Sequence, residues 1–128
     1  MLPTDPAVGD AKRTMLGAAQ EKWLADTLRA SQRAGTAWRL LGQQVLFSSV
    51  TPPALPIQNM DVWAGYPAAR TRLLEMLAAE EVTNLAILSG DLHSSWALDV
   101  PRNPWAASGP PALASVAVEF VTPAISSP

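Results

Sequence analysis

The strongest indication of the fold is residues 84–94, which read NLAILSGDLHS. Its apolar part, residues 85–88, ends abruptly in the sequence Ser-Gly-Asp at 89–91, which predicts a strand followed by a sharp turn. Because the apolar residues do not alternate with polar ones, both faces of the strand are expected to be buried, as in the centre of a sheet. The sequence therefore predicts a central strand with a neighbouring strand on each side.

Two helices and further strands are predicted around this stretch. Residues 17–35 (GAAQEKWLADTLRASQRAG) predict a helix, with Gln20 placed to reach back to its start at Gly17. A second helix is predicted from Pro67 (PAARTRLLEMLAAE), because proline suits a first helical turn. Other strands are predicted within 38–47 (WRLLGQQVLF), 94–100 (SSWALDV) and 115–122 (SVAVEFVT), with long loops at 51–67 and 101–111. This order predicts an α/β protein in which helices cover one face of a mixed sheet.

The composition excludes several classes of protein. With 48% apolar and 16% charged residues over 128 positions, the chain is not expected to be disordered. Its net charge is −2 and its nine Lys and Arg residues are scattered, so no nucleic-acid partner is expected. The absence of cysteine excludes disulfides, thiolate metal sites and a cysteine nucleophile. No apolar run reaches the roughly 18 residues of a transmembrane segment, and residues 1–10 do not have the pattern of a signal peptide.

Asp91 and His93 carry the chemistry that the sequence indicates. They follow the predicted central strand, at the edge where side chains converge in α/β proteins. In an extended loop, residues two apart point the same way with Cα atoms about 6.5 to 7 Å apart, so the pair can ligate one metal ion or two adjacent ions. Carboxylate and imidazole together suit iron, zinc or manganese. A loop histidine held by hydrogen bonds, beside an aspartate that caps a turn, is the open alternative.

Five sequence blocks carry a resemblance to a known family. In order they read RTMLGAAQEKWL (13–24), AWRLLGQQV (37–45), WAGYPAARTRLL (63–74), LAILSGDLHSSWALDV (85–100) and VEFVTPAISS (118–127). Their order and spacing resemble the PhoD-type alkaline phosphatase family. This resemblance implies that Gly90, Asp91 and His93 form the family's GDxH motif, in which Asp91 and His93 are catalytic metal ligands.

The same resemblance implies a fold, a cofactor and a compartment. The expected fold is a layered α/β/β/α sandwich with mixed sheets, of which residues 1–128 form the C-terminal portion of one catalytic domain, with the N-terminal half missing. The expected metals are iron and calcium, and the expected substrate is a small phosphate mono- or diester. The parent protein is expected to be exported. The competing expectation is a non-catalytic interaction module that keeps the scaffold without a complete metal site.

Four other polar residues are candidates for roles near the site. Gln43 and Gln44 could donate to phosphoryl oxygens from the end of their strand, or face water there. Arg70 could reach a substrate phosphate from the second helix, or lie on a solvated helix face. Glu119, a carboxylate in an otherwise apolar strand, is expected either to face water or to meet a partner near the site.

Several aromatic and hydroxyl residues have simpler interpretations. Trp23, Trp38 and Trp96 fall within regular elements and are expected in the core. Trp63 and Tyr66 are expected to anchor their loop. A serine nucleophile beside His93 is not supported, because no Gly-x-Ser-x-Gly pattern surrounds residues 94 and 95.

Overall fold

A four-stranded mixed sheet forms the centre of the structure, a computed structural model that describes residues 2, 4–52, 55, 59–105 and 114–123. The strands are β1 (Arg39–Gln43), β2 (Leu85–Ser89), β3 (Trp96–Pro101) and β4 (Ser115–Val121). They lie in the order β1-β2-β4-β3, with β1, β2 and β4 parallel and β3 antiparallel to β4. The prediction of a central strand is confirmed, because β2 lies between β1 and β4. The expected burial of both its faces is wrong, because Leu88 is 44% exposed.

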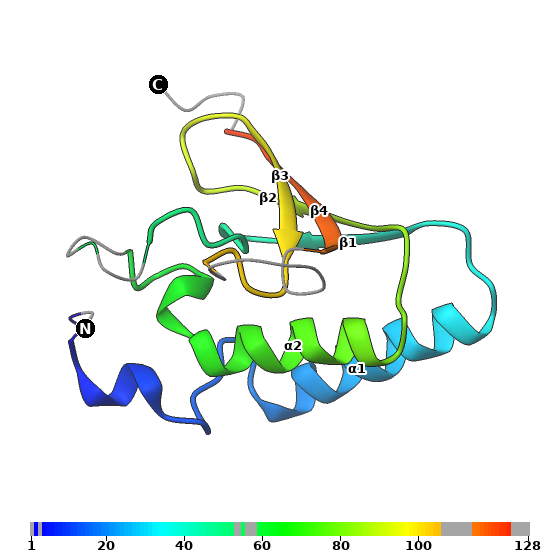
Figure 1. The fold of residues 1–128 in the computed structure, drawn as a ribbon, viewed down its shortest axis with the longest axis horizontal. Coiled ribbons are helices and arrows are strands. Elements are labelled where there is room, and N and C mark those ends of the chain that lie inside the picture. The colour runs from blue at the N-terminus through cyan, green and yellow to red at the C-terminus, as the bar shows by residue number, and fades with distance from the viewer. Residues whose placement is uncertain (1, 3, 53–54, 56–58, 106–113, 124–128) are drawn as a thin grey trace.

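Both long helices lie on one side of this sheet (Figure 1). They are α1 (Ala18–Arg33) and α2 (Pro67–Ala79), and two short 3-10 turns are η1 (Pro6–Gly9) and η2 (Trp63–Gly65). The predicted α/β class with a mixed sheet is therefore confirmed. The part of the chain that the structure describes contains one helix layer and one sheet, so the second sheet of the expected sandwich is not among these residues.

The core lies between the helices and the covered face of the sheet. Leu77 of α2 and Ile87 of β2 have no exposed surface, and Leu24 and Leu28 of α1 are buried beside them. Residues 45–49 fold back from β1 and contact both β4 and α2, because Glu119 binds their backbone and Arg70 binds the Phe47 carbonyl. This fold-back segment contributes Phe47 to the core, whose ring centroid lies 5.0 Å from that of Trp63 in an edge-on contact.

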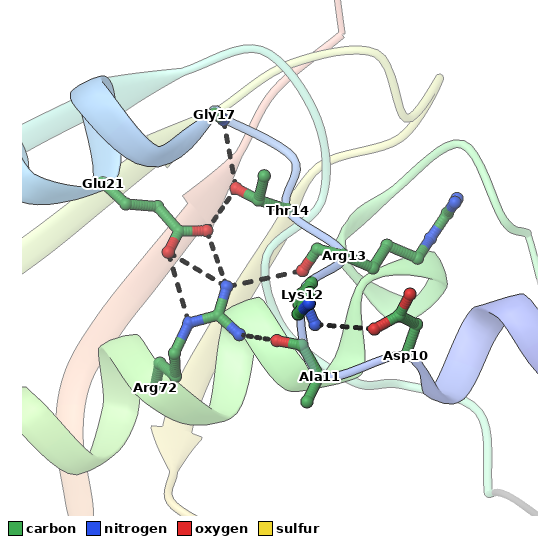
Figure 2. Close-up of polar contacts among 8 residues, drawn as sticks. All are labelled: Asp10, Ala11, Lys12, Arg13, Thr14, Gly17, Glu21 and Arg72. Carbon is green, nitrogen blue, oxygen red and sulfur yellow. Dashed lines mark hydrogen bonds and ion pairs between the residues drawn. The ribbon is translucent and has the colours of Figure 1, made fainter.

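Arg72 of α2 connects the N-terminal segment to both helices (Figure 2). Its guanidinium pairs with Glu21 of α1, with 2.9 Å between Nη2 and Oε1, and also donates to backbone carbonyls near the N-terminus. Thr14 accepts a hydrogen bond from the Gly17 amide at 3.0 Å and donates to Glu21. The helix begins after Gly17 as predicted, but the predicted role of Gln20 is wrong, because Glu21 makes the contact with the preceding segment.

Three tryptophans that were expected in the core are exposed. The exposed fractions are 61% for Trp23, 69% for Trp38 and 45% for Trp96. Trp23 lies beside the Leu24–Leu28 stripe of α1 rather than on it. Trp38 precedes β1 and Trp96 begins β3, so both lie at ends of the two edge strands. The expectation that these tryptophans lie in the core is wrong, because a position within or beside a helix or strand does not by itself bury a side chain.

The first strand is shorter and more exposed than predicted. β1 ends at Gln43, whereas the sequence predicted a buried strand within 38–47, and Leu40 is 70% exposed. An edge strand has a neighbour on one side only, and this one is covered by helices on one face only.

No helix in the described ranges is both long and apolar enough to span a membrane.

Candidate functional site

The loops after β1 and β2 leave the sheet at the same edge. Gln43 is level with Ser89 in the parallel pairing, so Gln44 and Gly90 are the first residues beyond the strands. A Cβ placed on Gly90 would lie 3.4 Å from the Gln44 carbonyl oxygen, which shows how closely the two chains pass. The carboxyl edge of two parallel strands is where α/β proteins place their ligands.

Asp91 lies at the centre of a tight turn directly after β2. The Leu92 amide donates to the Gly90 carbonyl at 2.8 Å, and Asp91 has a φ of 67°. A three-residue turn with positive φ is a rare and strained conformation, although Asp adopts it more readily than most residues. Strained residues are concentrated at functional sites, so this turn marks Asp91 as a candidate.

The structure places His93 in the same loop, two residues after Asp91. The Ser94 amide donates to the Leu92 carbonyl at 2.6 Å, so His93 lies at the centre of a second tight turn. Both Asp91 and His93 are exposed, and both follow the carboxyl end of β2 as predicted. An exposed carboxylate and an exposed imidazole are both available to a metal ion that reaches this edge.

A buried carboxylate lies below the loop. Glu119 has no exposed surface, and its Oε1 and Oε2 accept hydrogen bonds from the amides of Phe47 and Ser48 at 2.8 and 2.7 Å. The Ser89 hydroxyl donates to Oε1 at 2.5 Å. Three donors therefore satisfy the carboxylate, which explains how a charged group tolerates complete burial. The expectation that Glu119 meets a partner near the strand end is the one that the structure supports.

Gln43 connects this carboxylate to the core tryptophan. Its amide nitrogen donates to the Ser89 hydroxyl and to the Val45 carbonyl, and its Oε1 accepts from the Trp63 indole at 3.1 Å. Both N–H donors of the Gln43 amide thus have acceptors inside the protein, and contact with a substrate would require one of these bonds to break. Gln44, by contrast, is exposed at the same edge.

Arg70 is buried rather than solvated. It is 8% exposed, its Nε donates to the Phe47 carbonyl at 2.8 Å, and its guanidinium lies 5.2 Å from the Phe47 ring centre. Burial lowers the pKa of Arg70 to about 10, and the negative charge of Glu119 acts in the opposite direction. The alternative of a solvated helix face is wrong, because the fold-back segment covers this side chain. Arg72, two residues further along α2, is the exposed arginine.

The donor set is suitable for a metal but incomplete. Carboxylate and imidazole ligands fit iron, zinc or manganese, and a structural or catalytic ion takes about three to six ligands. Within the described ranges, no three His, Cys, Asp or Glu side chains converge on one point. A hollow of about 270 Å³ borders the loop through Leu92, and Val62 and Leu46 line its apolar wall. Asp91 and His93 can therefore supply part of a metal centre.

The partners that organise this edge were not predictable from the sequence. Ser89, Trp63 and the Phe47 and Ser48 amides were not singled out for it. The one signal available was Glu119, a carboxylate between apolar neighbours, which requires donors if it is buried. Its amide donors lie 72 and 71 positions earlier in the chain, a separation that no local pattern encodes.

The fold and the edge define a class, α/β proteins with polar loops after parallel strands, the edge at which such proteins generally place their ligands. Comparison with known proteins specifies the family. The family model described as PhoD-like phosphatase matches residues 2–128, and the chain belongs to this family.

Two relatives support this assignment. The chain is similar to Alkaline phosphatase D of Bacillus subtilis (strain 168), with 40% identity over 87 residues, which is 66% of this chain and 14% of that protein. It is also similar to a solved structure of PhoD, with a TM-score of 0.82, 32% identity, and coverage of 98% of this chain and 23% of that chain. The chain thus spans less than a quarter of the length of either relative.

Proposed function

We propose that this chain supplies part of the metal centre of a phosphoester hydrolase. The observation that carries the proposal is the position of Asp91, in a strained turn at the carboxyl edge of β2, in a chain that belongs to the PhoD-like phosphatase family. The relative from Bacillus subtilis is named as an alkaline phosphatase, which supports phosphate mono- or diesters as the substrate class.

In this proposal, Asp91 and His93 hold metal, and iron and calcium are the proposed ions. When bound, such ions supply an activated water and stabilise negative charge on the phosphoryl group. The remaining ligands come from outside the described residues, since these contain no complete set. We therefore propose that the chain is the C-terminal portion of a longer catalytic domain, which is exported in its parent protein.

Substrate contacts are divided between direct and indirect roles. Gln44 is the proposed direct contact, because it is exposed beside Gly90 and its amide can donate to a phosphoryl oxygen. Gln43 and Arg70 already donate to acceptors within the protein. Their proposed contribution is therefore indirect: they fix the positions of Ser89 and Phe47 beneath the bound phosphoester.

The test is hydrolysis of p-nitrophenyl phosphate and of its bis ester by the full-length protein that contains this chain. Asp91→Ala and His93→Ala should each lower kcat/KM by more than about 10-fold, because loss of a ligand or its support weakens the metal site. Ser95→Ala, an exposed change in the same loop, is the matched control and should leave kcat/KM unchanged.

The competing function, a non-catalytic interaction module, predicts a different result. The full-length protein would hydrolyse neither ester with iron and calcium supplied, and Asp91→Ala would change nothing. Hydrolysis that survives EDTA and both substitutions would contradict the metal role while leaving the family assignment in place.

A further inference from the structure

Three hydrogen bonds between side chains under the carboxyl edge run in one direction. The Trp63 indole donates to Gln43, the Gln43 amide donates to Ser89, and the Ser89 hydroxyl donates to Glu119. Glu119 accepts and donates nothing, so it is the terminal acceptor of the chain of bonds. Removing its negative charge would leave the Ser89 hydroxyl, the donor in that chain that can rotate freely, without the acceptor that orients it.

Ser89 connects this network to the proposed metal loop. It is the last residue of β2, and its carbonyl accepts the Thr122 amide at 3.0 Å just beyond β4. Gly90 and the strained turn at Asp91 follow immediately. Because a turn of this kind persists only where its surroundings hold it, the fixed position of Ser89 determines where the turn begins.

Glu119 also holds the chain on the other side of the edge. Its two backbone contacts fix Phe47 and Ser48, a few residues after Gln44. The same carboxylate therefore determines the path of both loops that leave β1 and β2. No other carboxylate in the described part of the chain is fully buried.

We infer that Glu119 is a positioning residue for the metal loop, acting through Ser89 on Gly90, Asp91 and His93. This inference rests on the proposed function for its metal readout, but its structural readout does not. The competing role is a purely structural one, in which Glu119 stabilises the core but does not change the conformation or the metal affinity of the loop.

Two serines provide a matched test. Ser89→Ala removes the hydroxyl that joins Glu119 to the end of β2, while both amide contacts to Glu119 stay in place. Ser48→Ala removes an equally buried hydroxyl that has no hydrogen-bond partner in the described structure, and it keeps the Ser48 amide that Glu119 binds. The two substitutions are chemically identical and differ in their connection to the network.

Glu119→Gln is the third variant. Whichever way the new amide is turned, its NH2 group faces a backbone amide donor of Phe47 or Ser48, so the network is broken from its acceptor end. Because this variant could unfold, Ser89→Ala carries the test, and Glu119→Gln is interpreted only where its circular dichroism matches wild type.

The first measurement is amide hydrogen exchange in the full-length protein, followed in peptides that cover residues 88–96. Ser89→Ala should raise exchange in these peptides by about 10-fold relative to Ser48→Ala, while peptides from α2 exchange as in wild type. Equal exchange in the two serine variants would overturn the inference, whether or not the protein binds metal.

The second measurement is metal retained per protein after dialysis against increasing EDTA, read by inductively coupled plasma mass spectrometry. Ser89→Ala and folded Glu119→Gln should lose half their metal at about 10- to 100-fold lower EDTA than wild type, and Ser48→Ala should match wild type. Metal retention equal to wild type in all three variants would show that Glu119 has a structural role only. A wild-type protein without metal would refute the proposed function, and the exchange measurement would still decide the role of Glu119.

Discussion

The two faces of the sheet differ in a way that reverses the usual distribution of charge. The helix-covered face contains Ile87 and Glu119, neither of which has any exposed surface. The open face carries apolar side chains, among them Leu88 at 44% and Phe120 at 49% exposure. A charged residue is thus fully buried while its apolar neighbour in β4 is half exposed.

This difference shows that backbone donors, rather than hydrophobicity alone, can decide which face of a strand is buried. In β4, alternation places Val118 and Phe120 on one face and Glu119 on the other. Hydrophobicity would bury the first pair, but the amides of the fold-back segment 45–49 satisfy the Glu119 carboxylate and allow it to face the helices.

The open face is a contiguous apolar surface. Sheets with parallel strands are usually covered on both faces, and contiguous exposed apolar patches mark surfaces that bind something. Leu40, Leu88, Val118 and Phe120 lie on adjacent strands of this face in register. The proposal of a longer catalytic domain supplies a cover for them.

The largest expected effect compares one leucine from the covered side with one from the open face. Leu77→Ala should lower the free energy of unfolding of the 128-residue chain by about 2 to 5 kcal/mol, because it leaves a cavity in a fully buried site. Leu40→Ala, at a residue that is 70% exposed, should change it by less than about 0.5 kcal/mol. Urea denaturation followed by circular dichroism measures both, and equal losses would contradict the assignment of the two faces.

A smaller effect is expected on self-association of the isolated chain. Phe120→Lys places a charge in the open apolar face and should weaken association by about 10-fold, or about 1.4 kcal/mol. Thr71→Lys adds the same charge on the exposed side of α2 and is the control. Sedimentation velocity gives both constants. If the two variants associate equally, the open face is not what brings the chains together.

The smallest effect concerns the solvent side of the helix layer. Hydrogen bonding from Lys22 lowers the pKa of Asp26 below its ordinary value of 3.8. A carboxylate whose pKa is lowered by folding stabilises the folded state at pH values above its ordinary pKa. This contribution is lost as the pH falls through the lowered pKa of the folded state. The Asp26→Asn variant should therefore unfold at slightly lower urea than wild type at pH 7, and the difference should shrink as the pH is lowered below 3.8. A difference that stays constant as the pH falls below 3.8 would mean that charge on Asp26 is not its cause.

The sequence predicted most elements because their signals are local. Pro67 and Gly17 set the starts of the two helices, and the apolar run 85–88 set the central strand. The mixed sheet with helices on one face then followed from the order of helices and strands. These signals depend on neighbours within a few residues, which is why one sequence was sufficient.

The burial of particular side chains could not be predicted in the same way. Trp38 precedes one edge strand and Trp96 begins the other, and no local pattern states which strand lies at an edge. Arg70 and Glu119 are buried because residues 45–49 fold back between the sheet and α2. At the candidate site, the positions of Asp91 and His93 after the strand were predictable, whereas the network that holds this edge depends on contacts far apart in the chain.

The most direct test of the account is the metal content of the folded full-length protein. Wild type should retain iron and calcium through gel filtration in metal-free buffer. The Asp91→Ala, His93→Ala double variant should lose at least one of these ions while keeping its circular dichroism spectrum. Asp99→Asn, an exposed aspartate on β3, should retain both ions as the control. Metal content in the double variant equal to wild type would contradict the claim that the loop after β2 binds metal.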